Sequence, residues 1–490
     1  MASISERHLK AVNKNMQKGQ KKALATFHQA ARRVPAYKDF LDKQAVNPKK
    51  IKNFGDFQHV PPVTKDNYLR QYPLDELMWD GSKFNADLIS VSSGSTGEPF
   101  FWLRDRLQHE EAADIYYDIY KNAFNSDSIP TLLVVCFSMG IWIAGSYTTL
   151  GAVACAERGL KMNVITPALD VHDSVAVIKR LKDDYEQIIL AGYPPFLKDL
   201  VDKGMEDGIG WKNLNVGFTA AGETITEELR EYFLKHGTAN SDPKRVISIY
   251  GTVDAGIVAY ETPFTIPIRR GIYQSGRQEQ LFGRGVMPTL GQFNPLQKYI
   301  EEIDGNIVFT SGTGLPLVRY NIKDTGGVIT DVSKLNDEPG GVMKILEKEN
   351  IKPLEWARPL VYVHGRADFT ASLYAVLIYP ENIKKAMFDP ELTKFTTGRF
   401  VMSVKNKKNL DQYLEIIIET KAGIKPAQSH ADKVRDAIIS TLLAENTEYR
   451  KLRSSIGEKT TPKIILKPQH DPQYFSRTPN KQSWTRTAAA

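Results

Sequence analysis

The chain has 490 residues and a mass of 55.1 kDa, more than one hydrophobic core usually serves, so we expect two domains. No apolar run reaches the roughly 20 residues that cross a bilayer, so we predict no membrane partner. The net charge of +7 comes from interspersed basic and acidic residues, which argues against a nucleic-acid partner. Two cysteines are too few for a disulfide framework, and the N-terminal segment lacks the apolar core of a signal peptide, so we expect a cytoplasmic protein.

The first part of the chain, to about residue 85, has a polar and mostly helical pattern. Within it, the proline-bounded segment 60–73 resembles an arm that packs against the rest of the chain. From about 86 to 330, apolar β-rich runs alternate with helical stretches, which is typical of an α/β protein. These runs occupy residues 131–137, 187–192, 215–222 and 246–251.

One helix can be predicted in detail directly after Gly222. Thr224 and Glu227 fit a capping box at its start, and Gly237 fits a left-handed stop at its end. Beyond about residue 366 the pattern changes to a smaller α+β arrangement, with strands at 400–405, 414–420 and 463–467 and a helix at about 430–445. We therefore predict a large domain of mixed β-sheets and helices over 1–366 and a small, mobile domain over 367–490.

The segment after the predicted strand ADLISV combines hydroxyl side chains with glycines. Glycines let the backbone approach an anion closely, while main-chain N–H and side-chain O–H groups donate to its oxygens. The segment lacks the Gly-Lys-Ser/Thr of a Walker loop, and a flexible surface turn is the structural alternative. Its predicted phosphate-binding residues are Ser92, Ser93, Gly94, Ser95, Thr96 and Gly97.

Further segments follow this one in an order and spacing that a known superfamily shares. They occupy residues 220–223, 250–254, 316–326, 365–368 and 477–481. With them the chain resembles the adenylate-forming (acyl-CoA synthetase) enzymes, and most closely their phenylacetate-CoA ligase-like branch. The resemblance implies an ATP-dependent acid ligase (AMP-forming), in which a small domain rotates between the formation of an acyl-adenylate and the transfer of the acyl group.

The same resemblance assigns the nucleotide site. Ala221, Gly222 and Glu223 would lie near the adenine, and the ring of Tyr250, followed by Gly251, would stack on it. Thr252 would reach a phosphate, and Asp254 would hold Mg²⁺. The match departs from the family pattern at Val253, which replaces a Ser or Thr, and at Asp254, which replaces a Glu. For Tyr250 alone, a core aromatic at a strand end is the alternative.

Four more polar residues complete the predicted site. Asp324 would accept the two ribose hydroxyls, although Arg319 and Asp324 could form only a surface ion pair. Arg366 would contact ribose or phosphate and Asp368 would act as the hinge, with a plain surface turn as the alternative. Lys481 would place its positive charge at the reacting carboxylate and α-phosphate, where it is the predicted catalytic lysine.

The acyl pocket and the acceptor are predicted from the family as well. Phe137, Trp142, Gly145 and Tyr193 follow two strand ends and would line the pocket, or they are simply core. Thioester-forming relatives usually carry an Arg-Gly pair past the hinge, where this chain has Tyr374-Ala375, a change that would narrow a pantetheine tunnel. CoA is thus the default second substrate, with an amine or carrier-protein acceptor open. A nucleotide-binding homologue without catalysis is the alternative from another class.

Overall fold

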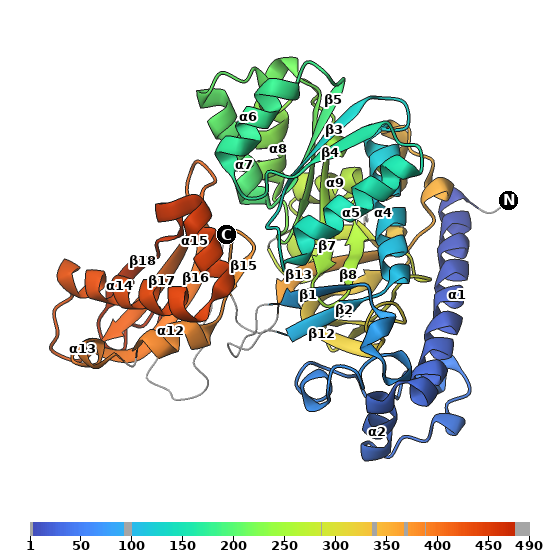
Figure 1. The fold of residues 1–490 in the computed structure, drawn as a ribbon, viewed down its shortest axis with the longest axis horizontal. Helices are drawn as coiled ribbons and strands as arrows, with labels where there is room; N and C mark the ends of the chain where they lie inside the picture. The colour runs from blue at the N-terminus through green and yellow to red at the C-terminus, as the bar shows by residue number, and fades with distance from the viewer. Residues whose placement is uncertain are drawn as a thin grey trace. The chain divides into compact units, whose positions relative to one another are not determined.

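The computed structural model describes residues 3–92, 100–285, 287–335, 341–366, 371–387 and 389–475. Within them the chain forms two compact units, a larger one of residues 3–92 and 101–365 and a smaller one that begins at Arg366 (Figure 1). The larger unit mixes β-sheet with helices and the smaller is α+β, which confirms the predicted fold class. None of the described helices combines the length and apolarity that a membrane span requires.

The larger unit begins with a helical arm. Ser3 and Glu6 form a capping box that starts the first helix, and Pro35 begins the second, where its missing N–H costs nothing. The first helix packs closely on the sheet region: at Gly19 only a glycine fits, since a Cβ there would lie 2.6 Å from Cβ of Pro295. The arm's helices are α1 (Ile4–Arg33), α2 (Pro35–Lys43) and α3 (Phe54–Phe57).

An 11-stranded sheet runs through the described part of the larger unit, in the order β10-β11-β12-β13-β9-β8-β7-β6-β5-β3-β4. Strands β4, β3, β5, β6 and β7 are parallel, and β3 and β5 are buried along their whole length, which explains their unbroken apolar sequences. The strands are β3 (Thr131–Cys136), β4 (Met162–Ile165), β5 (Gln187–Gly192), β6 (Val216–Ala221), β7 (Val246–Thr252), β8 (Gly256–Tyr260), β9 (Thr289–Gln292), β10 (Tyr299–Ile303), β11 (Asn306–Ser311), β12 (Leu317–Ile329) and β13 (Leu360–Arg366). A separate hairpin pairs β1 (Leu88–Ser92) with β2 (Phe100–Arg104).

Helices cover both faces of the parallel strands. Figure 1 shows α4 and α5 on one side of these strands and α6, α7 and α8 grouped on the other. Helix α4 approaches β6 so closely that a Cβ on Gly217 would lie 2.2 Å from Cε1 of Phe124. The helices are α4 (Arg106–Phe124), α5 (Ile143–Glu157), α6 (Val171–Leu181), α7 (Pro194–Glu206), α8 (Glu227–His236), α9 (Thr265–Gln274), α10 (Gln278–Phe282) and α11 (Gly341–Lys348).

The caps of α8 differ from the prediction. Thr226, rather than Thr224, is its N-cap, and its hydroxyl accepts from the backbone N–H of Leu229 at 3.2 Å. Gly237 has a right-handed conformation (φ −100°), so the predicted left-handed stop was wrong. A glycine is still needed there, because a Cβ would lie 2.7 Å from the ring of Phe218.

The smaller unit is a three-stranded sheet, β16-β17-β18, and a short hairpin, β14-β15, packed with helices. Tyr374 and Ala375 form the hairpin turn, both with positive φ (50° and 62°). Tyr374 is 1% exposed and belongs to the buried apolar cluster of this unit, so its phenol is not available to line the tunnel that the sequence suggested. The elements are β14 (Ala371–Leu373), β15 (Val376–Ile378), α12 (Pro380–Met387), α13 (Pro390–Thr393), β16 (Thr396–Asn406), β17 (Gln412–Thr420), α14 (Gln428–Glu445), α15 (Thr447–Ile456) and β18 (Lys463–Lys467).

Candidate active site

The carboxyl ends of the parallel strands carry most of the predicted site residues of the larger unit. Because β3, β5, β6 and β7 are parallel neighbours, the residues that follow them meet at one edge of the sheet. Phe137 follows β3, Tyr193 follows β5, Gly222 follows β6, and Thr252 ends β7. Segments that are far apart in the sequence therefore converge, with predicted acyl-pocket residues at the ends of β3 and β5 and predicted nucleotide-binding residues at the ends of β6 and β7.

Two motifs with the same spacing, Tyr250-x-x-x-Asp254 and Tyr320-x-x-x-Asp324, bind each other reciprocally. The hydroxyl of Tyr250 donates to Oδ2 of Asp324 at 2.5 Å, and the hydroxyl of Tyr320 donates to Oδ2 of Asp254 at 2.5 Å. Both aspartates are nearly buried, with 6% and 7% of their surface exposed. The residues predicted to contact adenine, ribose and metal thus form one connected group.

A β-bulge places Asp324. Along β12, Asn321 pairs with Val308 and Thr325 with Asn306, so one strand has two more residues than the other over this stretch. Lys323 takes up the excess with a left-handed backbone (φ 66°), and its N–H donates to Oδ1 of Asn321 at 2.8 Å. A bulge re-aims side chains, and this one accompanies the inward placement of Asp324.

Arg319, in the same strand, has another function. Its guanidinium donates to the carbonyls of Gln58 and Val60 in the N-terminal arm and pairs with Glu301 at 3.4 Å. It is 5% exposed, so the alternative of a surface ion pair with Asp324 was wrong. Burial raises the pKa of Glu301, against the opposing effect of the Arg319 charge. Arg319 therefore fixes the arm beside the site.

The turn that carries Asp254 is held by contacts from β2 and from the arm. Arg104, which is buried, donates to the carbonyl of Val253, and burial lowers its pKa to about 10. The hydroxyl of Thr252 accepts from the N–H of Ala255 at 3.0 Å. Nζ of Lys65 lies 3.1 Å from Oδ1 of Asp254. Asp254 thus has one oxygen bonded to a phenol and the other to an ammonium group.

The predicted phosphate-binding segment starts next to this turn. Nε1 of Trp102 donates to the hydroxyl of Ser92 at 3.2 Å. The ring of Trp102 lies 6.4 Å from that of Tyr320 and 5.4 Å from Nζ of Lys65. Ser92 is therefore in the same group as Asp254. The other predicted residues Ser93, Gly94, Ser95, Thr96, Gly97, Asp368 and Lys481, and the side chain of Arg366, lie outside the described residues.

The predicted adenine segment, residues 221–223, is anchored from behind. Gly222 has a left-handed backbone (φ 89°), which a glycine adopts without strain, and Ala221 and Glu223 are half-buried. Nη2 of Arg269 donates to the carbonyl of Ile225 at 2.9 Å, and Arg269 also binds Glu227.

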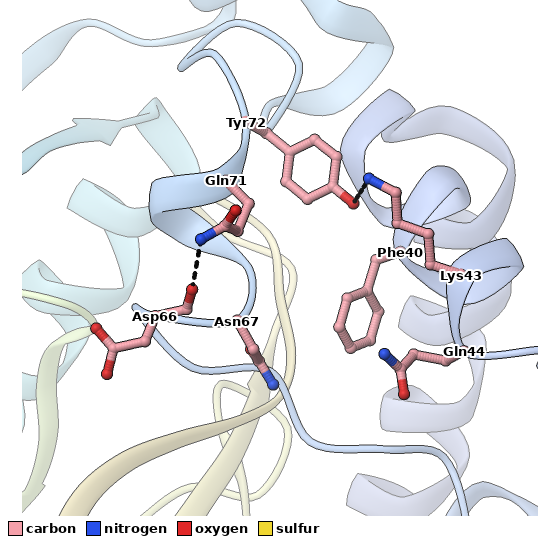
Figure 2. Close-up of a pocket in the computed structure, with 7 residues that line it drawn as sticks. All are labelled: Phe40, Lys43, Gln44, Asp66, Asn67, Gln71 and Tyr72. Atoms are coloured by element: carbon pink, nitrogen blue, oxygen red, sulfur yellow. Dashed lines mark hydrogen bonds between the residues drawn. The ribbon is translucent and has the colours of Figure 1, made fainter.

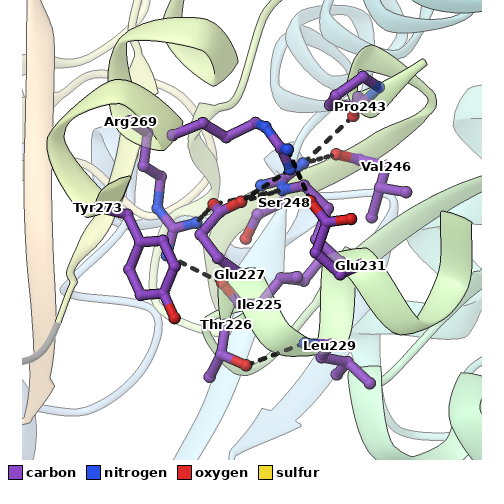
Figure 3. A network of polar contacts seen from close by, with 12 residues as sticks. Ile225, Thr226, Glu227, Leu229, Glu231, Pro243, Val246, Ser248, Arg269 and Tyr273 are labelled. Atoms are coloured by element: carbon purple, nitrogen blue, oxygen red, sulfur yellow. Dashed lines mark hydrogen bonds and ion pairs between the residues drawn. The ribbon is translucent and has the colours of Figure 1, made fainter. Parts of the chain in front are cut away.

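These contacts belong to a buried ionic network around α8 (Figure 3). Arg230 donates to both oxygens of Glu261 at 2.8 Å, and Glu261 accepts from the N–H of Ser248 on β7 at 2.8 Å. The network therefore joins the segment that follows residues 221–223, the predicted adenine segment, to the strand that carries Tyr250.

The predicted acyl-pocket residues fall into two pairs. The rings of Phe137 and Tyr193 meet edge to face, with centroids 5.0 Å apart, and both pack into a buried apolar cluster of the larger unit. Trp142 is the N-cap residue of α5, and Gly145 lies in its first turn. A Cβ on Gly145 would lie 2.4 Å from Sδ of Met139, so the segment before α5 folds tightly over it. These residues are mostly buried, as both the pocket and the core interpretations require.

A pocket of about 230 Å³ lies elsewhere, in the helical arm (Figure 2). None of the predicted site residues lines it. Its lining residues are Phe40, Lys43, Gln44, Asp66, Asn67, Gln71 and Tyr72.

Sequence reasoning missed Lys65, Trp102, Arg104 and the role of Tyr320. Tyr320 lies inside a motif that the sequence singled out, so its position was a usable signal. Lys65 is in the proline-bounded segment, where a polar pattern indicates packing rather than chemistry, and Trp102 and Arg104 lie in an ordinary-looking strand. Nothing in their spacing predicts their proximity to Asp254.

The fold of this chain is similar to that of solved ligase structures. A solved structure with the same fold is 2-hydroxyisobutyryl-CoA ligase in complex with 2-HIB-AMP and CoA in the thioesterification state, with a TM-score of 0.63 at 13% identity over 97% of this chain and 90% of that one. The same ligase in its postadenylation state with R3-HIB-AMP gives a TM-score of 0.53 at 14% identity over 96% and 89%. No protein-family model and no curated protein matches the sequence.

Proposed function

We propose that this chain is an ATP-dependent acid ligase that forms an acyl-adenylate and transfers the acyl group, by default to CoA. The observation that carries the proposal is the reciprocal pairing of Tyr250 with Asp324 and of Tyr320 with Asp254 at the carboxyl edge of the parallel strands. The shared fold supports it, because 2-hydroxyisobutyryl-CoA ligase has been solved with an acyl-AMP and CoA. The sequence motifs favour the phenylacetate-CoA ligase-like branch, and a cytoplasmic location would supply ATP and CoA.

In the first half-reaction a carboxylate oxygen of the acid bonds to the α-phosphorus of ATP. The bond from that phosphorus to the bridging oxygen breaks, and pyrophosphate leaves with the electron pair. Asp324 has the chemistry to accept the ribose hydroxyls, in place of the O–H of Tyr250. Lys481 remains the predicted cation at the reacting centre, and rotation of the small domain around Asp368 remains the predicted link to acyl transfer.

The carboxylate of Asp254 has lone pairs left for a Mg²⁺ ion that is held by this one protein carboxylate. Each carboxylate oxygen has two lone pairs, and Oδ1 uses one of them toward Lys65. Mg²⁺ commonly takes one or two carboxylates together with substrate phosphates and water. When bound, the ion would neutralise phosphate charge during adenylation.

The test is a search for the adenylate itself. The protein is incubated with ATP, Mg²⁺ and a library of aryl and alkyl acids, and acyl-AMP is detected by mass spectrometry together with pyrophosphate exchange. We expect one class of acid to give acyl-AMP, and Lys481→Ala to abolish exchange while ATP still binds. If no acid gives acyl-AMP although ATP binds, the protein is a non-catalytic nucleotide-binding homologue.

The acceptor is tested separately on the same adenylate. CoA, amines and a carrier-protein thiol are added in turn, and the product is identified by mass. A thioester with CoA supports the default acceptor. If the product is an amide, or a thioester with the carrier protein alone, that acceptor replaces CoA in the proposal, and the proposed first half-reaction is unaffected.

A further inference from the structure

The N-terminal arm brings a lysine to the nucleotide site. Val63 pairs with Tyr320 as a short parallel bridge: its N–H donates to the carbonyl of Arg319 at 3.1 Å, and its carbonyl accepts from Asn321 at 2.9 Å. The arm therefore extends the sheet alongside β12, on the stretch that precedes Asp324. Lys65 follows two residues later, beside Asp254.

The arm is fixed on both sides of Lys65. Before it, the guanidinium of Arg319 binds the carbonyls of Gln58 and Val60. After it, Asp66 pairs with Lys323 at 2.9 Å, and Asn67 closes a turn with Thr64 through reciprocal hydrogen bonds at 2.6 and 3.0 Å. These contacts hold the backbone without any help from the side chain of Lys65.

Lys65 has donors to spare. An ammonium group has three N–H donors, and among the described residues its one polar partner is Oδ1 of Asp254. The side chain is 21% exposed, whereas that of Asp254 is 6% exposed, so solvent or a ligand reaches the cation more easily than its partner. The cation also lies 5.4 Å from the ring of Trp102, whose Nε1–H binds Ser92. Lys65 thus stands between the predicted metal ligand and the start of the predicted phosphate-binding segment.

From this position we infer that Lys65 is a phosphate-binding residue, which donates to the triphosphate of ATP while Asp254 holds the associated Mg²⁺. The inference rests on the proposed function and assigns to the arm a part in adenylation. The lysine contributes a positive charge from the larger unit itself. It is therefore needed where the triphosphate is present, and it is not needed once pyrophosphate has left.

Ligand binding tests this without relying on activity. The affinities of Lys65→Met and of the unchanged protein are measured by titration calorimetry for a non-hydrolysable ATP analogue and for AMP, each with Mg²⁺. Loss of a charge-assisted contact in Lys65→Met should lower the affinity for the ATP analogue by about tenfold or more and change the affinity for AMP by less than about twofold. Lys65→Arg should restore most of the loss, because it keeps the charge.

The matched control is Lys43→Met, which removes a lysine that pairs with Asp39 at 2.6 Å in helix α2 of the same arm and should leave both affinities unchanged. Because Lys65→Met leaves the carboxylate of Asp254 without its cation, thermal melting is measured alongside, and Lys65→Arg provides a variant that keeps the pair. If Lys65→Met melts earlier but binds the ATP analogue as tightly as the unchanged protein, Lys65 is a structural ion-pair partner and the inference is overturned. Failure of the unchanged protein to bind either nucleotide would instead overturn the proposed function, and the inference with it.

A kinetic comparison gives a second readout. Acyl-AMP formation from ATP should slow in Lys65→Met, whereas thioester formation from supplied acyl-AMP and CoA should proceed at the unchanged rate. An equal loss of rate in both half-reactions would contradict a role for Lys65 that is confined to the triphosphate.

Discussion

Replacing Arg230 with methionine should destabilise the larger unit strongly. The side chain of Arg230 is fully buried and binds both oxygens of Glu261 at 2.8 Å, and its Nε lies 3.3 Å from Glu227. Without it, Glu261 keeps the N–H of Ser248 at 2.8 Å, while its next cation, Arg269, is 3.7 Å away. Removing one partner of a buried ion pair leaves an uncompensated charge and costs about 3–5 kcal/mol. We expect that loss for Arg230→Met.

Urea unfolding followed by tryptophan fluorescence measures this loss of stability in the larger unit. The tryptophans of the described residues all lie in the larger unit, at positions 79, 102, 142, 211 and 356. Arg158→Met is the control, because Arg158 pairs with Asp114 at 2.7 Å on the surface, where the side chains are 38% and 61% exposed. Such a pair contributes about 1 kcal/mol or less.

The second control removes the charge that the first substitution leaves behind. Arg230→Met combined with Glu261→Gln should be less destabilised than Arg230→Met alone, because no unpaired carboxylate remains at position 261. A loss for Arg230→Met no larger than that of Arg158→Met would refute the reasoning. So would a double variant whose losses simply add, since the two groups would then be uncoupled.

Four further outcomes follow from the structure. Asp324→Asn should weaken ATP binding by about 10- to 100-fold in calorimetry, as expected for a lost hydrogen bond to a charged group, and an unchanged affinity would remove Asp324 from the ribose site. Gly145→Ala places a Cβ 2.4 Å from Sδ of Met139 and should raise the KM for the acid about tenfold or more, with ATP affinity intact; an unchanged KM would assign Gly145 to the core alone. Ala375→Gly should stabilise the smaller unit by about 1 kcal/mol in hydrogen exchange, because glycine adopts φ 62° without strain, and a loss of stability would contradict this. Burial lowers the pKa of His8, so the unfolded chain binds more protons and stability should rise between about pH 5 and 7, a slope that His8→Phe should reduce.

The strands of the larger unit could be predicted because burial on both faces leaves a plain sequence signal. β3 and β5 are buried throughout, and each is an unbroken apolar run. The start of α8 was harder, because threonines flank Ile225 on both sides. Ile225 is completely buried, so the chain crosses the core before the helix begins, and only the second threonine reaches a free helical N–H. The choice between Thr224 and Thr226 as the N-cap therefore depends on the burial of Ile225, which local sequence does not show.

The sequence could predict the proximity of candidate-site residues that follow the ends of neighbouring strands. It could not predict proximity that depends on pairing between segments far apart in the chain. Gly222 follows β6 and Tyr250 lies in β7, and these strands are parallel neighbours, so the proximity of the two residues follows from the α/β pattern. The proximity of Lys65 to Asp254 follows from the bridge between Val63 and Tyr320, which joins the arm to a strand far along the chain. A lysine in a polar segment has the same local sequence whether it faces solvent or a buried carboxylate.

Asp254 is one of the positions at which the sequence departs from the pattern of the adenylate-forming enzymes that it resembles, and its surroundings offer a physical reason why the departure is tolerable. An aspartate arm is shorter than a glutamate arm, yet Tyr320 fixes one of its oxygens at 2.5 Å and Lys65 approaches the other at 3.1 Å. Val253 lacks the usual hydroxyl, but Arg104 binds its backbone carbonyl and holds the turn. Asp254 is thus buried and held from two sides, as its proposed role at the phosphates requires.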